Sequence, residues 1–205
     1  METHTDATDI DNSVIGHTMH DYYDLIMAVL DEVAFALHSV SDTQVATLRL
    51  AIHDASRVFI AGKGRSGLLA RAFALRLMHL GLTIHVVDEV TTPAIMQGDL
   101  LILISGSGET ASILQYSAQA RSHGAKVALI TAFPNSSIAQ RSDIVVHIPA
   151  PSVKADVVNE VTSFQPMANM FEQSLMLLLD VITLQLMSDL GLTQEQLAAR
   201  HANLE

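Results

Sequence analysis

Five short apolar segments, separated by residues of helical or turn character, limit the possible folds of this chain more than any other feature. They are rich in residues that favour strands, and they span residues 57–61, 83–87, 100–104, 126–131 and 144–148. Helical segments are predicted between them at residues 67–80 and 111–123, with a short helix near 136–141. Strands that alternate with helices are joined by right-handed crossovers, which give a buried parallel sheet with helices on both faces. The sequence therefore predicts an α/β fold, a three-layer sandwich with a five-stranded parallel sheet.

Helices are also predicted before and after the sheet. Before the sheet, one helix spans residues 18–38 and a second runs from Ser41 or Asp42 to about residue 55. After the sheet, two helices span residues 165–190 and 193–200. Pro166 suits the first turn of the third of these helices, and Thr193 is the expected cap of the last one. Residues 1–16 are polar and acidic, which is typical of a flexible leader. Residues 17–205 are predicted to form a single domain with an N-terminal helical arm and a C-terminal helix and tail.

The composition indicates a globular protein that covers part of its apolar surface by association. Hydrophobic residues make up 49% of the chain and charged residues 16%, and the mean hydropathy is +0.33. A small monomer does not easily bury that much apolar surface. In the predicted helix at 165–190, apolar residues cover more than one face, so part of this helix is expected to contact another subunit. We therefore expect a homo-oligomer, a tetramer built as a dimer of dimers.

The charge balance and the absence of cysteine exclude several kinds of partner and site. The formal net charge is −11, whereas nucleic acid and anionic membrane surfaces require concentrated Lys and Arg, so neither is expected as a partner. The longest apolar run, residues 175–187, is too short to span a bilayer. Without cysteine there is no disulfide, no thiolate zinc site and no cysteine nucleophile, which is compatible with a cytoplasmic location.

Two turns rich in glycine and serine follow two of the predicted strands. Residues 105–110 read Ser-Gly-Ser-Gly-Glu-Thr, and residues 62–67 read Gly-Lys-Gly-Arg-Ser-Gly. Where a strand breaks into such a turn and then opens a helix, free N–H groups and the positive helix end converge, so the expected ligand is a phosphate. The alternative is an ordinary turn between strand and helix. Because ligands of open parallel sheets bind beyond the carboxyl ends of the strands, the two turns are expected to face each other.

Other chemistries that use glycine-rich turns fit these residues less well. The turn at 62–67 has the G-x-G-x-x-G spacing of dinucleotide sites, and Asp88 or Glu89 could supply the usual acidic partner. However, Arg65 and Ser66 make this turn polar, so NAD binding is a minor alternative. Neither turn has the Gly-Lys-Ser/Thr ending of a Walker A loop, and the second lacks the G-x-S-x-G spacing of serine hydrolases. No His-x-x-x-His pair lies on a recognisable helix, so no catalytic metal is expected.

Several segments, taken in order, resemble one known family. The turn at 105–110 resembles the phosphosugar motif of sugar isomerase (SIS) domains, and residues 62–66 resemble their first sugar-contacting loop. Similarity to the 6-phospho-3-hexuloisomerase group is found in Arg-Leu-Met-His-Leu-Gly at 76–81, Thr-Thr-Pro-Ala-Ile at 91–95, Gln-Pro-Met at 165–167, Phe-Glu at 171–172 and Arg-His-Ala-Asn-Leu-Glu at 200–205. The resemblance runs from about residue 28 to residue 205, and it implies a flavodoxin-like strand order.

This resemblance implies an isomerase that interconverts D-arabino-hex-3-ulose 6-phosphate and D-fructose 6-phosphate, the second step of the ribulose monophosphate route of formaldehyde fixation. It implies neither a metal nor an organic cofactor. The chemistry requires a base that takes a proton between two oxygenated carbons, and donors that stabilise an enediolate. Two other functions stay open: an arabinose 5-phosphate isomerase, and a non-catalytic phosphosugar sensor. A sensor that regulates transcription needs a DNA-binding segment, for which the acidic residues 1–55 are poorly suited.

The resemblance also implies which residues bind the substrate. Carried over position by position, the expected substrate-binding residues are Gly64, Arg65, Ser66, Ser105, Ser107, Gly108 and Thr110. Arg65 is the expected local cation in an otherwise acidic protein. Glu89 and Thr92 are further candidates to line the crevice beyond the second strand.

Two residues are expected to carry the catalysis. Glu172 matches a family position early in the long C-terminal helix and is the expected base, because the helix dipole favours a carboxylate there. His201 matches the terminal histidine of SIS isomerases, where the tail of one subunit reaches the site of another, and it is the expected proton shuttle or oxyanion partner. The two roles are exchangeable, and Glu160, in the predicted loop at 149–164, stays an alternative base.

Overall fold

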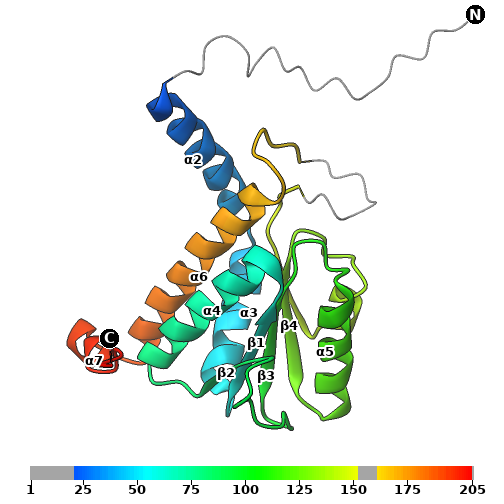
Figure 1. Cartoon of the computed structure of the whole chain (residues 1–205), viewed down its shortest axis with the longest axis vertical. Helices are drawn as coiled ribbons and strands as arrows, with labels where there is room; N and C mark the ends of the chain where they lie inside the picture. Colours follow the sequence, from blue (N-terminus) through cyan, green and yellow to red (C-terminus); the bar gives the residue numbers. More distant parts are fainter. Residues whose placement is uncertain (1–20, 152–160, 205) are drawn as a thin grey trace, which may run out of the picture.

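The computed structural model describes residues 21–151 and 161–204, and Figure 1 shows their arrangement. The predicted leader and the alternative base Glu160 lie outside the described residues. The five strands are β1 (Val58–Gly62), β2 (Ile84–Val86), β3 (Leu100–Ile104), β4 (Lys126–Thr131) and β5 (Ile144–His147). They form one sheet in the order β2-β1-β3-β4-β5, and every neighbouring pair is parallel. The predicted parallel sheet and its flavodoxin-like order are therefore confirmed.

Helices cover both faces of the sheet, as predicted. The helices are α2 (Tyr22–His38), α3 (Asp42–Asp54), α4 (Gly64–His79), α5 (Ala111–Ser122), the 3-10 turn η1 (Ala139–Arg141), α6 (Asn169–Asp189) and α7 (Gln194–Ala198). In Figure 1, α3, α4 and α6 lie on one side of the sheet and α5 on the other, while α2 projects as an arm alongside α6. Each side has its own hydrophobic cluster, and β3 at the centre is buried along its whole length. This three-layer arrangement leaves the strand ends open for a site.

Local sequence explains where several helices begin. Asp21 accepts a hydrogen bond from the backbone N–H of Tyr23 at the start of α2, and Ser41 caps α3 in the same way. Thr193 forms a capping box with Gln196 at the start of α7, which confirms the predicted cap. Gly191, with φ +62°, separates α6 from α7 because its left-handed backbone ends the preceding helix.

Two helix starts differ from the prediction. α4 begins at Gly64 and not at residue 67, because Gly64 takes a left-handed φ of +59° that turns the chain directly from strand into helix. α6 begins at Asn169 and not at residue 165, so Pro166 is not in its first turn. The preceding residues are held instead by Glu32 of α2, whose carboxylate accepts hydrogen bonds from Ser163, Phe164 and Gln165.

The helix α6 is the long apolar element of the fold. The apolar run at 175–187 was expected to be too short to span a bilayer, but the helix that contains it has 21 residues and is long and apolar enough to do so by length and composition alone, a property that it shares with the core helices of soluble proteins. In this structure it packs against α2, α3 and α4, and its inward face contributes Phe171, Leu175 and Ile182 to the core. Its outward face leaves Met176 and Leu184 exposed. The prediction that this helix is apolar on more than one face is confirmed.

Candidate active site

The two glycine and serine turns meet at the carboxyl ends of β1 and β3, which are neighbours in the sheet. Between these turns and the start of α6 lies a cavity of about 420 Å³, the size range of small-molecule sites. It is lined by Lys63, Gly64, Arg65, Ser66, Ile104, Ser105, Gly106, Ser107, Thr110, Met167, Ala168, Asn169 and Glu172. The structure thus brings together most of the predicted substrate-binding residues and Glu172.

The turn after β3 gathers hydroxyl groups at the start of α5. The Ser105 hydroxyl lies 3.2 Å from that of Thr110 and accepts a hydrogen bond of 3.1 Å from the Gly108 N–H. The Ser107 hydroxyl accepts a 3.3 Å hydrogen bond from the Glu109 N–H. Thr110 occupies the N-cap of α5, and its side chain makes no capping hydrogen bond to the helix, so its hydroxyl is available to a ligand at the positive helix end. These features suit an anion with several oxygen atoms.

The same turn is braced from behind by the segment that follows β4. The N–H of Ile138 donates to the Gly108 carbonyl at 3.2 Å, and the N–H of Ser137 donates to the Glu109 carboxylate at 2.7 Å. Gly108 has a φ of +65°, and a Cβ at this residue would lie 1.9 Å from the hydroxyl of Ser136. Gly108 therefore shapes the turn through its backbone and does not line the cavity. Ser136 and Ser137 were not predicted to belong to the site, because in the sequence they are only a pair of small polar residues after a strand.

Glu172 lies in the first turn of α6 and faces the turn after β1. One of its carboxylate oxygens accepts a hydrogen bond of 3.1 Å from Arg65, and Arg65 also contacts the side-chain oxygen of Asn169. The Glu172 side chain is 13% exposed, whereas that of Arg65 is 50% exposed. Burial raises the pKa of Glu172, and the Arg65 guanidinium opposes this effect. A partly buried carboxylate that faces a cavity is a candidate general base.

Glu89 and Thr92, the further candidates for the crevice, do not line this cavity. Glu89 forms an ion pair with Arg71 on the outer side of α4, because the turn after β2 carries it towards that arginine. The Thr92 hydroxyl donates a 2.6 Å hydrogen bond to the Val86 carbonyl and so closes the turn after β2. Conversely, Lys63 and Asn169 line the cavity and were not selected from the sequence. The sequence signal for Lys63 as a site residue is its place inside the glycine turn. Asn169 can be recognised as a site residue only from its contact with Arg65 in the structure.

His201 lies away from Glu172 within one chain. Its ring stacks on that of His79 with centroids 5.3 Å apart, and Arg200 donates to the His79 carbonyl at 3.1 Å. Glu172 is near the beginning of α6, whereas the tail follows the other end of this helix, at Asp189. Because an α-helix rises 1.5 Å per residue, Asp189 lies about 25 Å from Glu172. The tail turns back at Gly191 and packs on the end of α4 (Figure 1). A role for His201 in this cavity thus requires a second subunit.

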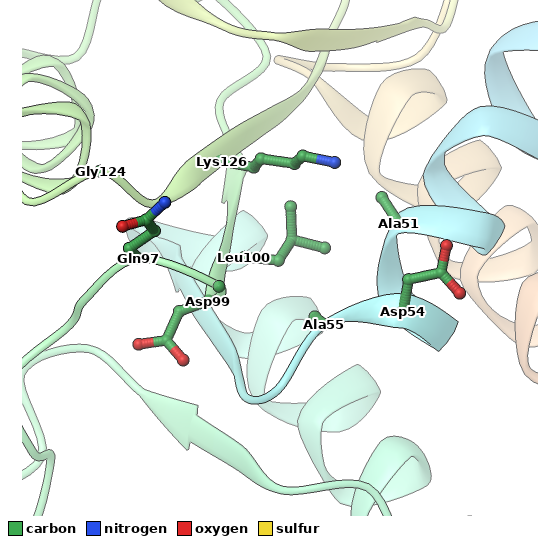
Figure 2. Close-up of a pocket in the computed structure, with 9 residues that line it drawn as sticks. Ala51, Asp54, Ala55, Gln97, Asp99, Leu100, Gly124 and Lys126 are labelled. Carbon is green, nitrogen blue, oxygen red and sulfur yellow. The ribbon is translucent and has the colours of Figure 1, made fainter.

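A second cavity, of about 330 Å³, lies at the opposite ends of the strands, where β3 and β4 begin. Figure 2 shows Lys126 extending across it towards the end of α3, where Asp54 lies. The nearby Asp99 is turned towards other partners, because it pairs with Arg57 and accepts from the Met96 N–H at 2.8 Å. Ligands of parallel sheets bind at the carboxyl ends, so the cavity beside Ser105 is the candidate active site. In residues 21–151 and 161–204, no group of three His, Asp or Glu side chains is placed to hold a metal ion.

Comparison with known proteins agrees with this geometry. The SIS domain model matches residues 51–179. The chain is 39% identical over 180 residues to the 3-hexulose-6-phosphate isomerase of Bacillus subtilis, with 88% of this chain and 97% of the relative covered. It is 44% identical to that of Mycobacterium gastri, with 86% and 88% covered. A crystal structure from Methanococcus jannaschii, for which a 3-hexulose-6-phosphate isomerase function was inferred, has a TM-score of 0.77 at 29% identity and covers 89% of this chain and 99% of its own. The chain therefore belongs to the SIS domain family, in the group of the 3-hexulose-6-phosphate isomerases.

Proposed function

We propose that this protein is a 3-hexulose-6-phosphate isomerase that interconverts D-arabino-hex-3-ulose 6-phosphate and D-fructose 6-phosphate. The observation that carries the proposal is that one cavity is lined both by the turn after β3, with Ser105, Ser107 and Thr110, and by the partly buried carboxylate of Glu172. Family membership supports the same reaction. We extend the proposal to a cytoplasmic enzyme of the ribulose monophosphate pathway that works without a metal or organic cofactor.

In the proposed mechanism the phosphate binds between Ser105, Ser107 and Thr110, at the positive end of α5. This anchor fixes the other end of the sugar beside Glu172. The Glu172 carboxylate takes the proton from C2 of the hexulose phosphate, and the electrons form a 2,3-enediolate. The hydroxyl proton then moves from O2 to O3, and a proton is returned at C3 to give fructose 6-phosphate with its carbonyl at C2. Arg65, which already contacts Glu172, stabilises negative charge on the enediolate oxygens.

A substrate panel tests the proposed function. Purified protein should convert D-fructose 6-phosphate to the hex-3-ulose phosphate, and should act on D-arabinose 5-phosphate at least a hundredfold more slowly. Preferred conversion of arabinose 5-phosphate would replace this function by the pentose isomerase alternative. Tight binding of either sugar without any conversion would indicate a sensor.

The position of Glu172 predicts a specific pH dependence. Because burial raises the pKa of the free carboxyl and only its ionised form is a base, kcat/KM should fall on the acidic side at a pH above about 4.3, the ordinary value for glutamate. In the Arg65→Gln variant this acidic limb should move to still higher pH, because the guanidinium that favours the ionised carboxyl is gone. The measurement is kcat/KM between pH 4 and 9 for both proteins. An acidic limb that stays in place in the variant would contradict Glu172 as the base.

We further propose a homotetramer in which apolar helix faces are covered by other subunits. In α2, Tyr22, Tyr23 and Phe35 are exposed, and in α6 Met176 and Leu184 are exposed. These exposed apolar side chains lie on two helices that pack against each other, and contiguous apolar surface of this kind is typical of subunit interfaces. The proposal includes the arrangement suggested by family resemblance, in which His201 of one subunit serves the cavity of another.

Mixed oligomers test the role of His201. Glu172→Gln and His201→Ala subunits should each be inactive as homo-oligomers, and co-refolded mixtures should regain activity, because some cavities then contain an intact Glu172 and an intact His201 from a neighbour. The measurement is the specific activity of mixtures whose subunit exchange is confirmed by mass spectrometry. Mixed oligomers without regained activity would contradict a role for His201 of one subunit in the cavity of another.

A further inference from the structure

Lys63 holds an unusual position at the edge of the candidate active site. It lies between Gly62 and Gly64, so it carries the only side chain in the turn that joins β1 to α4. Two flanking glycines give such a turn considerable conformational freedom. Lys63 is also the N-cap residue of α4, but its side chain makes no capping hydrogen bond. The backbone of the turn is held by the pairing of Gly62 with Ile104 and by the hydrogen bond of 3.2 Å from the Gly67 N–H to the Lys63 carbonyl, and the Lys63 side chain adds a further attachment.

The Lys63 side chain is held by two residues from other elements. Its ammonium group donates to the Asp88 carboxylate at 2.6 Å and to the Tyr116 hydroxyl at 3.3 Å, and it lies over the Tyr116 ring at 5.4 Å. The Tyr116 hydroxyl lies 2.7 and 2.9 Å from the two Asp88 oxygens. Neither Asp88 nor Tyr116 lines the cavity that contains Glu172. The ammonium group is thus tied outside the cavity, to the turn after β2 and to α5.

The backbone of Asp88 supports a specific role for this contact. Asp88 has a φ of +77°, a left-handed conformation that is sterically unfavourable for residues other than glycine. Aspartate tolerates it better than most residues do, and here its side chain is engaged by both Lys63 and Tyr116. Strained residues of this kind tend to occur where the surrounding structure requires a particular geometry. The strain is located at the contact that holds Lys63.

We propose that Lys63, tied by Asp88 and Tyr116, is a positioning residue that fixes the turn from which Arg65 reaches Glu172. Arg65 is two residues beyond Lys63, in the first turn of α4, and contacts both Glu172 and Asn169. A turn with two glycines that lost its tie would allow Arg65 to leave this arrangement. The inference rests on the proposed function, because its effect on catalysis acts through Glu172.

The test uses Lys63→Met and Asp88→Gly. Glycine relieves the backbone strain at residue 88, so an effect of Asp88→Gly reports the lost side chain and not a damaged backbone. Each variant should lower kcat about tenfold and change KM less than about twofold, because small misplacements of reacting groups affect the chemical step. The double variant should be no slower than the slower single variant, because both remove the same contact. Asp88→Asn keeps an acceptor oxygen and should retain most of the activity.

Arg121→Met is a matched control. The Arg121–Asp143 ion pair has side chains 47% and 41% exposed, close to the 45% and 50% of Lys63 and Asp88, and Arg121 does not line the candidate active site. This variant should leave kcat and KM unchanged. Hydrogen exchange of ligand-free protein adds a readout that does not depend on the reaction: residues 62–67 should exchange at least threefold faster in Asp88→Gly than in the wild type, with no such change in Arg121→Met.

Unchanged exchange of residues 62–67 in Asp88→Gly would overturn the proposal. A loss of activity in Lys63→Met that Asp88→Gly does not share would also overturn it. The same holds if the variants raise KM and leave kcat unchanged, because either result would mean that Lys63 contacts the substrate directly. A wild-type protein without isomerase activity would refute the proposed function, and the exchange measurement alone would then decide whether the tie exists.

Discussion

Replacing Glu172 with glutamine should lower kcat by about two orders of magnitude or more, the scale of losing a general base. Glutamine keeps the size of the side chain and can still accept a hydrogen bond from Arg65, which lies 3.1 Å from the carboxylate. The variant should therefore bind substrate with little change in KM. Steady-state kinetics with the hex-3-ulose phosphate, together with a thermal unfolding curve, provides the measurement.

Glu195→Gln is the matched control for this substitution. Glu195 also lies in the first turn of a helix, but α7 is far from the cavity and Glu195 does not line it. The control should retain full activity. If Glu172→Gln kept near-normal turnover, the base would have to be another group, and the assignment of Glu172 would be wrong.

Replacing Gly108 with alanine should damage both the stability of the protein and the phosphate turn. The new Cβ would lie 1.9 Å from the Ser136 hydroxyl, at a backbone φ of +65° that alanine adopts only with strain. Left-handed strain and overpacking together should lower the free energy of unfolding by about 3 kcal/mol. Because the Gly108 N–H and carbonyl hold Ser105 and Ile138 in place, KM for the phosphosugar should also rise at least tenfold.

Gly191→Ala separates strain from the steric clash. Gly191 has a φ of +62°, but a Cβ there meets nothing within 4 Å, and the residue lies between α6 and α7, away from the cavity. This variant should lose about 1 kcal/mol in the free energy of unfolding and keep its KM. Urea unfolding and steady-state kinetics check both variants. Equal losses of stability at the two positions would show that Ser136 does not brace the turn.

The layer architecture could be predicted because it depends on local patterns. The strands are continuous apolar runs, and a run such as Leu100–Ile104 is readable because both faces of a central parallel strand are buried. The turn after it could be predicted for a similar reason: Gly106 and Gly108 allow a backbone that packs closely against Phe171 and Ser136. The strand order followed from family resemblance and is confirmed by the sheet.

The remaining features depend on contacts between residues that are far apart in the sequence. Arg65 meets Glu172 and Asn169 only because α4 and α6 begin at the same edge of the sheet. α6 starts late because Met167 takes a left-handed φ of +58°, and the residues before it are hydrogen-bonded to Glu32, more than a hundred residues earlier, which no local pattern around Pro166 reveals. Glu89 was expected near the substrate because it follows a strand, but an arginine on the neighbouring helix pairs with it instead. Charged side chains pair with whichever opposite charges the fold places near them, so their roles could not be predicted from their spacing in the sequence alone.

The central claim is that this protein moves a proton between C2 and C3 of a hexulose 6-phosphate. The most direct measurement is incubation of the purified protein with D-fructose 6-phosphate in deuterated water, followed by NMR of the sugar. We predict that deuterium enters C3 of fructose 6-phosphate, that the hex-3-ulose phosphate is formed, and that the Glu172→Gln variant does neither at a comparable rate. Absence of both label at C3 and hex-3-ulose phosphate, or label entering only C1, would contradict the account.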